Sequence, residues 1–102
     1  MAKSGIKELE KTKTVPVVKE PPMYKVLLLN DHYTTMEFVV VILEQVFNKT
    51  TIEAMKIMLA VHRAGSGLAG LYPKEVAETK IAVVQGMARK EGFPLQCIME
   101  QA

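Results

Sequence analysis

Three consecutive polar residues, Asn30, Asp31 and His32, follow directly on the apolar run at residues 26–29. An amide oxygen, a carboxylate and an imidazole nitrogen all accept hydrogen bonds, so together they suit a small cationic group such as an ammonium. Asn and Asp also favour turns, because their side chains bond to the nearby backbone in place of a strand ladder. The pattern therefore predicts either a loop that binds a cation or a plain Asx-type turn without a ligand.

A second polar candidate, His62, stands in an apolar stretch of a predicted helix. Met55 and Met58 flank it when the sequence is projected at about 100° per residue. One interpretation is a core histidine that bonds to a backbone carbonyl. The other is that His62 is the polar group aimed at a ligand in an apolar pocket, where methionines suit several ligand shapes.

Motifs for catalysis and metal binding are weak. The sequence has no phosphate-binding glycine loop, no paired cysteines and no His-Glu-x-x-His spacing. Ser4 and Ser66 are its only serines, and neither stands in a pattern typical of a nucleophile. Asp31, His32 and His62 could hold a metal ion if the loop met the helix, but their spacing does not favour this. We therefore predict a protein that is not an enzyme and that uses no cofactor or metal.

These groups lie where a predicted strand gives way to helices. Hydrophobic periodicity predicts strands at residues 24–29, 68–72 and 95–99, and helices at residues 35–47, 51–64 and 73–90. Thr34 with Glu37, and Thr50 with Glu53, match the capping box that begins a helix, and Gly65 ends the second helix. The order strand, helix, helix, strand, helix, strand predicts an α+β domain with a three-stranded antiparallel sheet packed against three helices.

Further predictions concern packing. The second helix is apolar around most of its circumference, so it should pack on more than one neighbour. Gly70 inside a strand predicts a bulge or close packing. Lys80 projects into an apolar stripe of the third helix, and its ammonium either extends past its stem to water or marks a face that meets a partner. Cys97 should be a buried structural thiol. The stripe that we expect to be buried consists of Val76, Ala77, Ile81, Val83, Val84, Met87 and Ala88.

Composition bounds the class of protein. The chain has 102 residues, enough for one domain, and its 49% hydrophobic and 24% charged residues are typical of a globular protein with a core. A formal net charge of +2 does not favour a nucleic-acid surface, and no stretch is long and apolar enough to span a membrane. A single cysteine and no visible secretory signal predict a cytoplasmic protein, which we expect to be a monomer.

Residues 1–22 differ in composition from the rest of the chain. Lysines and glutamates alternate there, apolar residues are sparse, and Pro16, Pro21 and Pro22 disfavour both helix and strand. We predict a flexible, disordered N-terminal extension at residues 1–22 and a core domain at residues 23–102.

Several motifs, in order and at near-constant spacing, resemble the ClpS family of bacterial adaptors. The motifs are Pro-Pro-Met-Tyr-Lys-Val at 21–26, Asn-Asp-x-Tyr-Thr at 30–34, Met-Glu-Phe-Val at 36–39, Met-Leu-Ala-Val-His at 58–62, Val-Ala-Glu-Thr-Lys at 76–80 and Pro-Leu-x-Cys at 94–97. The resemblance implies an ATP-independent adaptor of the N-degron pathway. Such an adaptor captures proteins with a free α-amino group on a bulky first residue (Leu, Phe, Tyr or Trp). It delivers them to the AAA+ unfoldase ClpA for degradation by ClpP.

The resemblance also implies roles for individual residues. The α-amino group of the peptide would be held by Asn30, Asp31 and His62. The rim beside the peptide backbone would comprise His32, Thr34 and Thr35. The pocket for the first side chain would be lined by Met36, Val39, Met58, Val61 and Leu95, with Met36 as a gate against β-branched residues. The N-terminal domain of ClpA would dock on Glu75 and Lys80.

Two residues depart from the family pattern. His32 stands where the family usually has a second aspartate, and Thr35 where it usually has proline. A lost negative charge should weaken attraction for an ammonium, and a lost proline should leave the rim less rigid. We therefore expect narrower or weaker specificity.

Two other classes of protein remain as alternatives. The first is a ribosome- or factor-binding module, since a similar small α+β domain occurs at the C-terminus of the ribosomal stalk protein. That alternative gives Asn30, Asp31 and His62 no joint role. The second is a metal-dependent enzyme.

Overall fold

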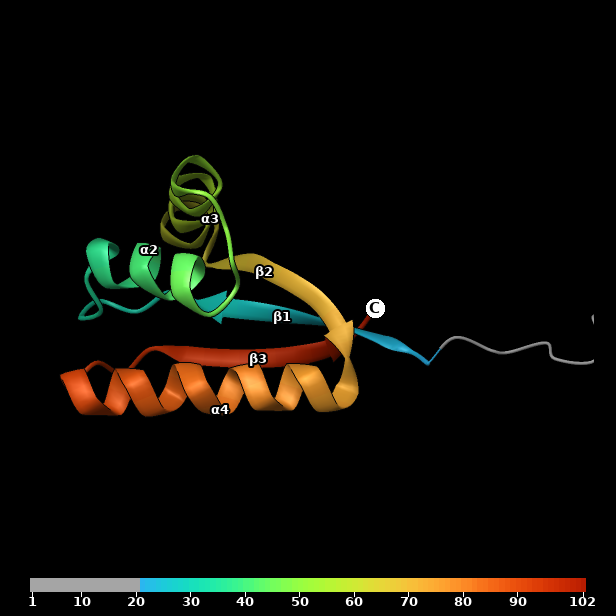
Figure 1. Cartoon of the computed structure of the whole chain (residues 1–102). Coiled ribbons are helices and arrows are strands. Elements are labelled where there is room, and N and C mark those ends of the chain that lie inside the picture. Colours follow the sequence, from blue (N-terminus) through green and yellow to red (C-terminus); the bar gives the residue numbers. More distant parts are fainter. Residues whose placement is uncertain (1–20) are drawn as a thin grey trace, which may run out of the picture.

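The computed structural model describes residues 21–102 and shows a three-stranded sheet with three helices (Figure 1). Its elements are β1 (Met23–Leu29), α2 (Met36–Gln45), α3 (Thr51–Ala64), β2 (Ser66–Pro73), α4 (Lys74–Glu91) and β3 (Gln96–Gln101). β1 is the central strand and pairs antiparallel with β2 on one side and β3 on the other. The predicted α+β fold class and order of elements are confirmed. The predicted extension lies, apart from Pro21 and Pro22, outside the described residues.

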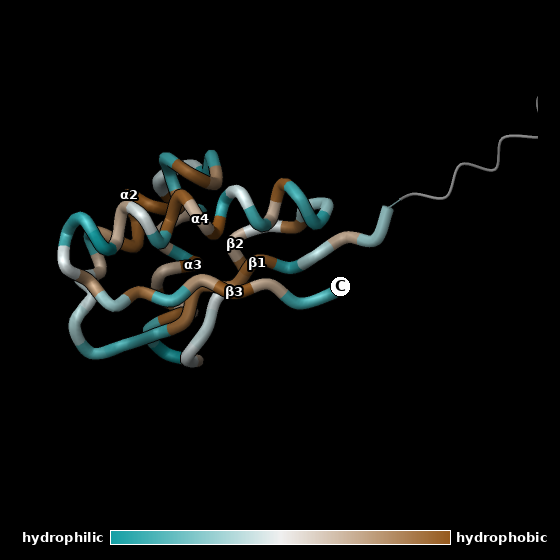
Figure 2. The backbone as a smooth tube through the Cα atoms, turned by 90° about the horizontal axis from the view of Figure 1, so that it is seen from below, coloured by the Kyte–Doolittle hydropathy of each residue, from teal (hydrophilic) through white to brown (hydrophobic). Residues whose placement is uncertain are grey.

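The core forms between the sheet and the helices. Val26 and Leu28 of β1 are fully buried, as expected for alternate residues on one face of a strand. Ile42 and Leu43 of α2 are also fully buried. The hydrophobic segments of β1 and β3 meet near the centre of the molecule in Figure 2. Burial of this apolar surface stabilises the fold.

The middle of β2 contains an irregularity in its pairing with β1. Val26 pairs with Gly70 and Leu27 with Leu68, so Ala69 is an extra residue on β2. A Cβ atom at Gly70 would lie 2.6 Å from the Tyr72 ring, so any larger residue there would require this ring to move. The predicted bulge or close packing at Gly70 is confirmed.

Helix α2 begins at a different cap from the predicted one. The N-cap is Thr35, whose Oγ1 accepts a hydrogen bond from the Phe38 amide at 3.1 Å. The hydroxyl of Thr34 instead donates to Oδ2 of Asp31 at 2.7 Å. The predicted capping box of Thr34 with Glu37 is therefore wrong, because Asp31 binds the Thr34 hydroxyl within the preceding loop.

The caps of α3 agree with the sequence prediction. Thr50 Oγ1 accepts from the Glu53 amide at 3.1 Å, and Glu53 Oε1 accepts from the Thr50 amide at 2.9 Å. Gly65 ends the helix with a φ of 92°, which glycine adopts without strain. α3 contacts both α2 and β2, as its broad apolar surface predicted. No helix within residues 21–102 has the length and apolar character needed to cross a membrane.

Helix α4 runs along β3 and contacts all three strands (Figure 1). Ala77, Val84 and Ala88 face the core and are buried. Val76 and Val83 are 42% and 45% exposed, so the prediction that they are buried is wrong. Ala77, Val84 and Ala88 are seven and four residues apart, which is two turns and one turn of helix, so they form a narrow buried stripe. Val76 and Val83 each precede a residue of this stripe and lie beside it.

Candidate functional site

A cavity of about 490 Å³ opens where the loop after β1 meets α2 and α3. Polar and apolar side chains share its lining: Asn30, Asp31, His32, Thr34, Met36, Val39, Met58, Val61 and His62. The structure thus brings the predicted α-amino-binding residues together with most of the predicted side-chain pocket. Each group has members in both of the segments that form the cavity, residues 30–39 and residues 58–62, which are far apart in the sequence.

Strand pairing places the loop beside the end of α3. Leu29 at the end of β1 pairs with Ser66, the first residue of β2. The amide of Asn30 then donates to the carbonyl of Gly65, the cap of α3, at 2.9 Å. His62 stands one turn before that cap, so Asn30 and His62 line the same cavity.

Asp31 organises the loop through three hydrogen bonds. Its Oδ1 accepts from the amides of Tyr33 at 2.8 Å and Thr34 at 2.7 Å, and its Oδ2 accepts from the Thr34 hydroxyl at 2.7 Å. Burial raises the pKa of Asp31, but these hydrogen bonds and the nearby His32 outweigh burial and lower it below its ordinary value. Asp31 is therefore both the centre of an Asx-type turn and a charged carboxylate in the cavity lining.

The His62 side chain is exposed and lines the cavity. The interpretation of His62 as a core histidine is therefore wrong. Its position in the last turn of α3 carries it out of the helix packing and toward the loop. An imidazole there can accept a hydrogen bond from a ligand when it is neutral.

Two helical pairs form the apolar part of the cavity. Met36 with Val39 on α2, and Met58 with Val61 on α3, are each three residues apart and so share one helix face. Val39, Met58 and Val61 are buried, while Met36 is 43% exposed. Three side chains therefore form the apolar interior, and Met36 lies nearer the solvent.

Two predicted site residues lie elsewhere. Leu95 is buried and lines a separate hollow of about 280 Å³ beside Phe93 and Pro94. Thr35 caps α2 and is absent from the cavity lining. Their parts in peptide binding stay predictions. Within residues 21–102 no three His, Cys, Asp or Glu side chains are grouped so that they could hold a metal ion.

One interpretation expected the Lys80 ammonium on α4 to extend past its stem to water. The ammonium instead bonds within the domain. Its Nζ donates to the carbonyl of Val46 at 2.8 Å and lies 5.8 Å from the Phe47 ring centroid and 5.2 Å from that of Tyr72. The residue is partly buried. Sequence reasoning missed this contact, because the acceptor is a backbone oxygen far away in the chain.

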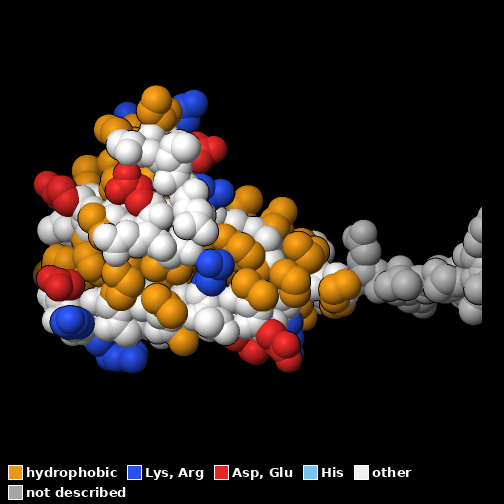
Figure 3. All heavy atoms as spheres, viewed as in Figure 1, with side chains coloured by type: hydrophobic (Ala, Val, Ile, Leu, Met, Phe, Trp, Pro, Cys, Tyr) orange, Lys and Arg blue, Asp and Glu red, His pale blue; other side chains and the backbone are white. Residues whose placement is uncertain are grey.

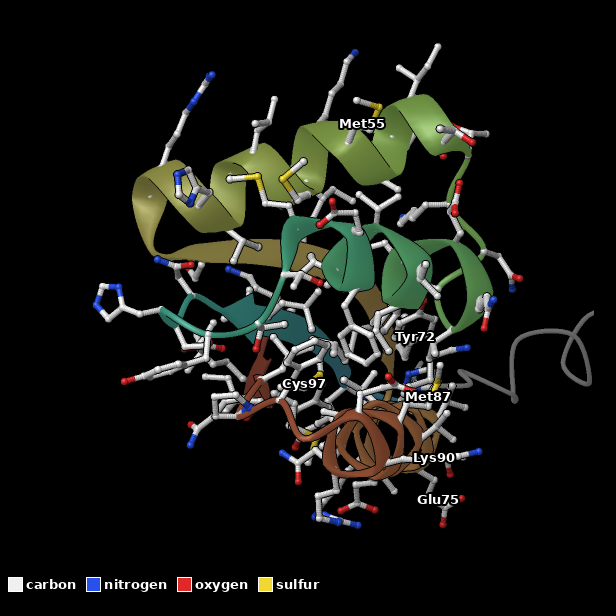
Figure 4. The ribbon with its side chains drawn as sticks, turned by 90° about the vertical axis from the view of Figure 1, so that its left-hand side faces the viewer. Met55, Tyr72, Glu75, Met87, Lys90 and Cys97 are labelled. Atoms are coloured by element: carbon white, nitrogen blue, oxygen red, sulfur yellow. The ribbon has the colours of Figure 1, made fainter. Side chains whose placement is uncertain are left out.

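The surface around α4 is mixed in character. Glu75 is exposed and lies on the outer side of α4, away from α2 and α3 (Figure 4). Figure 3 shows hydrophobic side chains gathered in a band between α4 and the two helices above it. Cys97 lies inside the molecule and is 2% exposed, and burial raises the pKa of its thiol to about 12. It is a structural thiol, as predicted.

Comparison with protein sequences gives consistent results. Residues 19–98 match the family model described as ATP-dependent Clp protease adaptor protein ClpS. The chain is 53% identical over 98 residues to the ATP-dependent Clp protease adapter protein ClpS of Phenylobacterium zucineum, covering 96% of this chain and 90% of that protein. It is 60% identical over 84 residues to the ClpS of Nitratidesulfovibrio vulgaris, covering 82% of this chain and 84% of that one.

Comparison with solved structures agrees. The structure of Agrobacterium tumefaciens ClpS2 bound to L-phenylalaninamide superposes with a TM-score of 0.78 at 37% sequence identity, covering 81% of this chain and all of that chain. The family match at residues 19–98 includes the loop and both helices that form the cavity. The chain belongs to the ClpS family, the adaptors of the ATP-dependent Clp protease, and it is not an enzyme.

Proposed function

We propose that this protein binds the free α-amino group and the bulky first side chain (Leu, Phe, Tyr or Trp) of N-degron proteins. It then delivers them to the unfoldase ClpA for degradation by ClpP. One observation carries the proposal: a single cavity has acceptors for an ammonium on one side and an apolar lining on the other. L-phenylalaninamide, the ligand of the Agrobacterium relative, has both a free α-amino group and a phenyl side chain.

The polar side of the cavity accounts for the free N-terminus. An ammonium loses its hydration on entering a pocket and needs charged or polar acceptors in exchange. Asn30 and a neutral His62 accept its hydrogen bonds, and Asp31 supplies the negative charge. The imidazole of His62 must be neutral for this role, because a protonated imidazole only donates hydrogen bonds.

The apolar side accounts for the size of the first residue. Burying a leucine or phenylalanine side chain against Val39, Met58 and Val61 contributes roughly 1.5–3 kcal/mol. Neither this contribution nor the ammonium contacts suffice alone, so the cavity selects for both features together. Met36 at the exposed edge acts as a gate against β-branched residues.

The rim sets how selective the site is. Thr34 contacts the peptide backbone, and its hydroxyl is already oriented by Asp31. His32 and Thr35 replace the aspartate and the proline usual in the family, which reduces the local negative charge and the stiffness of the loop. The accepted range of first residues is therefore narrower, or binding weaker, than is usual in the family.

Delivery uses α4 and the N-terminal extension. The N-terminal domain of ClpA docks on the α4 surface that includes Glu75 and Lys80, and the exposed Val76 and Val83 add apolar area to it. The extension at residues 1–22 engages the unfoldase during transfer. The protein acts as a cytoplasmic monomer without metal or cofactor.

The test is fluorescence-anisotropy binding to short peptides with free and acetylated N-termini. The first residues are Leu, Phe, Tyr, Trp, Ile, Val, Ala and Arg. Tight binding confined to free, bulky, unbranched first residues supports the proposal. If none of the peptides binds with measurable affinity, the proposal is contradicted and a ribosome- or factor-binding module is favoured.

A further inference from the structure

A second cavity of about 470 Å³ lies beside the first, in the groove between α2 and α3. Its lining is mostly apolar: Met36, Glu37, Val40, Val41, Thr51, Met55 and Met58. Met55 is carried by α3, which lies above α2 in Figure 4. Apart from Met36 and Met58, the residues of this lining take no part in the binding site proposed above.

Among the residues that the structure describes, Met36 and Met58 are the ones that line both cavities. Their side chains therefore lie between the two cavities. Methionine is unbranched and has three rotatable side-chain bonds, so it adapts to different neighbours at low cost. Met36 is also 43% exposed, so few neighbours hold its thioether in place.

Beyond Met36 and Met58, the groove offers further apolar side chains for contact. Val41 is 36% exposed and Met55 48% exposed, and each faces the groove. Glu37 is the one ionisable residue in the lining, and it is exposed. An apolar group that entered the groove would bury these two side chains, while the carboxylate of Glu37 could stay in water.

We propose that the groove is a second chamber of the first-residue pocket. When Met36 and Met58 rotate, the chamber accepts the distal part of an aromatic side chain longer than that of phenylalanine. The occupant is the first side chain of the substrate itself, since the groove adjoins the first-residue pocket at the shared Met36 and Met58. The inference rests on the proposed function and extends it to a class of elongated aromatic first residues.

The probe is a peptide that begins with biphenylalanine, which is phenylalanine with a second phenyl ring at the para position. We expect it to bind within about tenfold of the matching Phe peptide, because the extra ring is buried in the chamber. Overpacking of a closed pocket would instead weaken binding by about a hundredfold. That result, with the Phe peptide still bound, overturns the inference.

A substitution on the far side separates the chamber from the main pocket. Val41 lines only the groove, so Val41→Trp fills it without touching the first cavity. We expect unchanged affinity for Leu and Phe peptides and at least about tenfold weaker binding of the biphenylalanine peptide. Ile52→Trp is the matched control, because Ile52 on α3 is 68% exposed and lines neither cavity. Equal effects of the two variants contradict the inference.

Methyl NMR of the unmodified protein provides a readout that needs no variant. Met55 lines only the groove, so its methyl resonance should shift with the biphenylalanine peptide and not with the Leu peptide. An unmoved Met55 methyl in the saturated biphenylalanine complex overturns the second chamber. Failure of the Leu and Phe peptides to bind would show that the proposed function itself is wrong. This outcome differs from loss of biphenylalanine binding alone, which concerns only the second chamber.

Discussion

The ammonium of Lys80 lies 2.8 Å from the carbonyl oxygen of Val46 and joins the middle of α4 to the end of α2. The last carbonyl groups of a helix have no partner within the helix, so a cation there satisfies an acceptor and interacts favourably with the helix dipole. The other end of α2 carries Met36 and Val39 of the cavity. One hydrogen bond thus connects the proposed docking helix to the helix that lines the peptide site.

Replacing Lys80 tests this connection. Lys80→Ala removes the bond to Val46 and the contacts with Phe47 and Tyr72, so we expect the free energy of unfolding to fall by about 1–3 kcal/mol. Urea denaturation measures the change. Lys74→Ala is the control, because Lys74 is exposed at the start of the same helix. A loss no larger than that of the control would show that the bond contributes nothing to stability.

The lowered pKa of Asp31 predicts how stability depends on pH. A carboxylate whose pKa is lower in the folded than in the unfolded state stabilises the fold above its unfolded pKa, near 4. That contribution disappears as the pH falls through the folded pKa. We expect the stability difference between the wild type and Asp31→Asn to shrink from about pH 5 to about pH 2. A constant difference over this range, measured by urea denaturation, would contradict the assignment.

The proposed role of His62 predicts that its side chain is needed for peptide binding. His62→Ala removes one acceptor for the ammonium, so we expect affinity for a free Leu peptide to fall by about tenfold. Fluorescence anisotropy measures the change. Arg63→Ala is the control, because Arg63 is exposed on the same helix and does not line the cavity. Equal affinities of the two variants would contradict the role of His62.

Burial predicts that Cys97 is unreactive. Its thiol is 2% exposed and has a pKa raised to about 12, so almost no thiolate exists at neutral pH. We expect negligible modification by iodoacetamide in the native protein and complete modification after unfolding in urea. Mass spectrometry measures the extent of modification. Rapid modification of the native protein would show that the core opens around β3.

Local sequence determined the features whose partners are close in the chain. Thr50, Glu53 and Gly65 predicted the ends of α3 correctly, because each cap involves residues a single turn apart. The order of elements and the bulge near Gly70 also follow from local patterns of hydrophobicity and chain flexibility. The resemblance to the family motifs added a prediction that local patterns do not make, namely that Asn30, Asp31 and His62 form one site.

Tertiary structure decided the features that depend on distant partners. The residues around His62 matched both a core and a pocket, and pairing of β1 with β2 placed it beside the loop. The predicted cap at Thr34 is wrong for a local reason instead. The Thr34 hydroxyl donates to Asp31, three residues earlier, and Thr35 caps α2.

The partner of Lys80 and the exposure of Val76 and Val83 could not be read from periodicity either. An apolar pattern shows that a side chain favours burial, but the neighbours available to cover it are set by the packing of the whole chain.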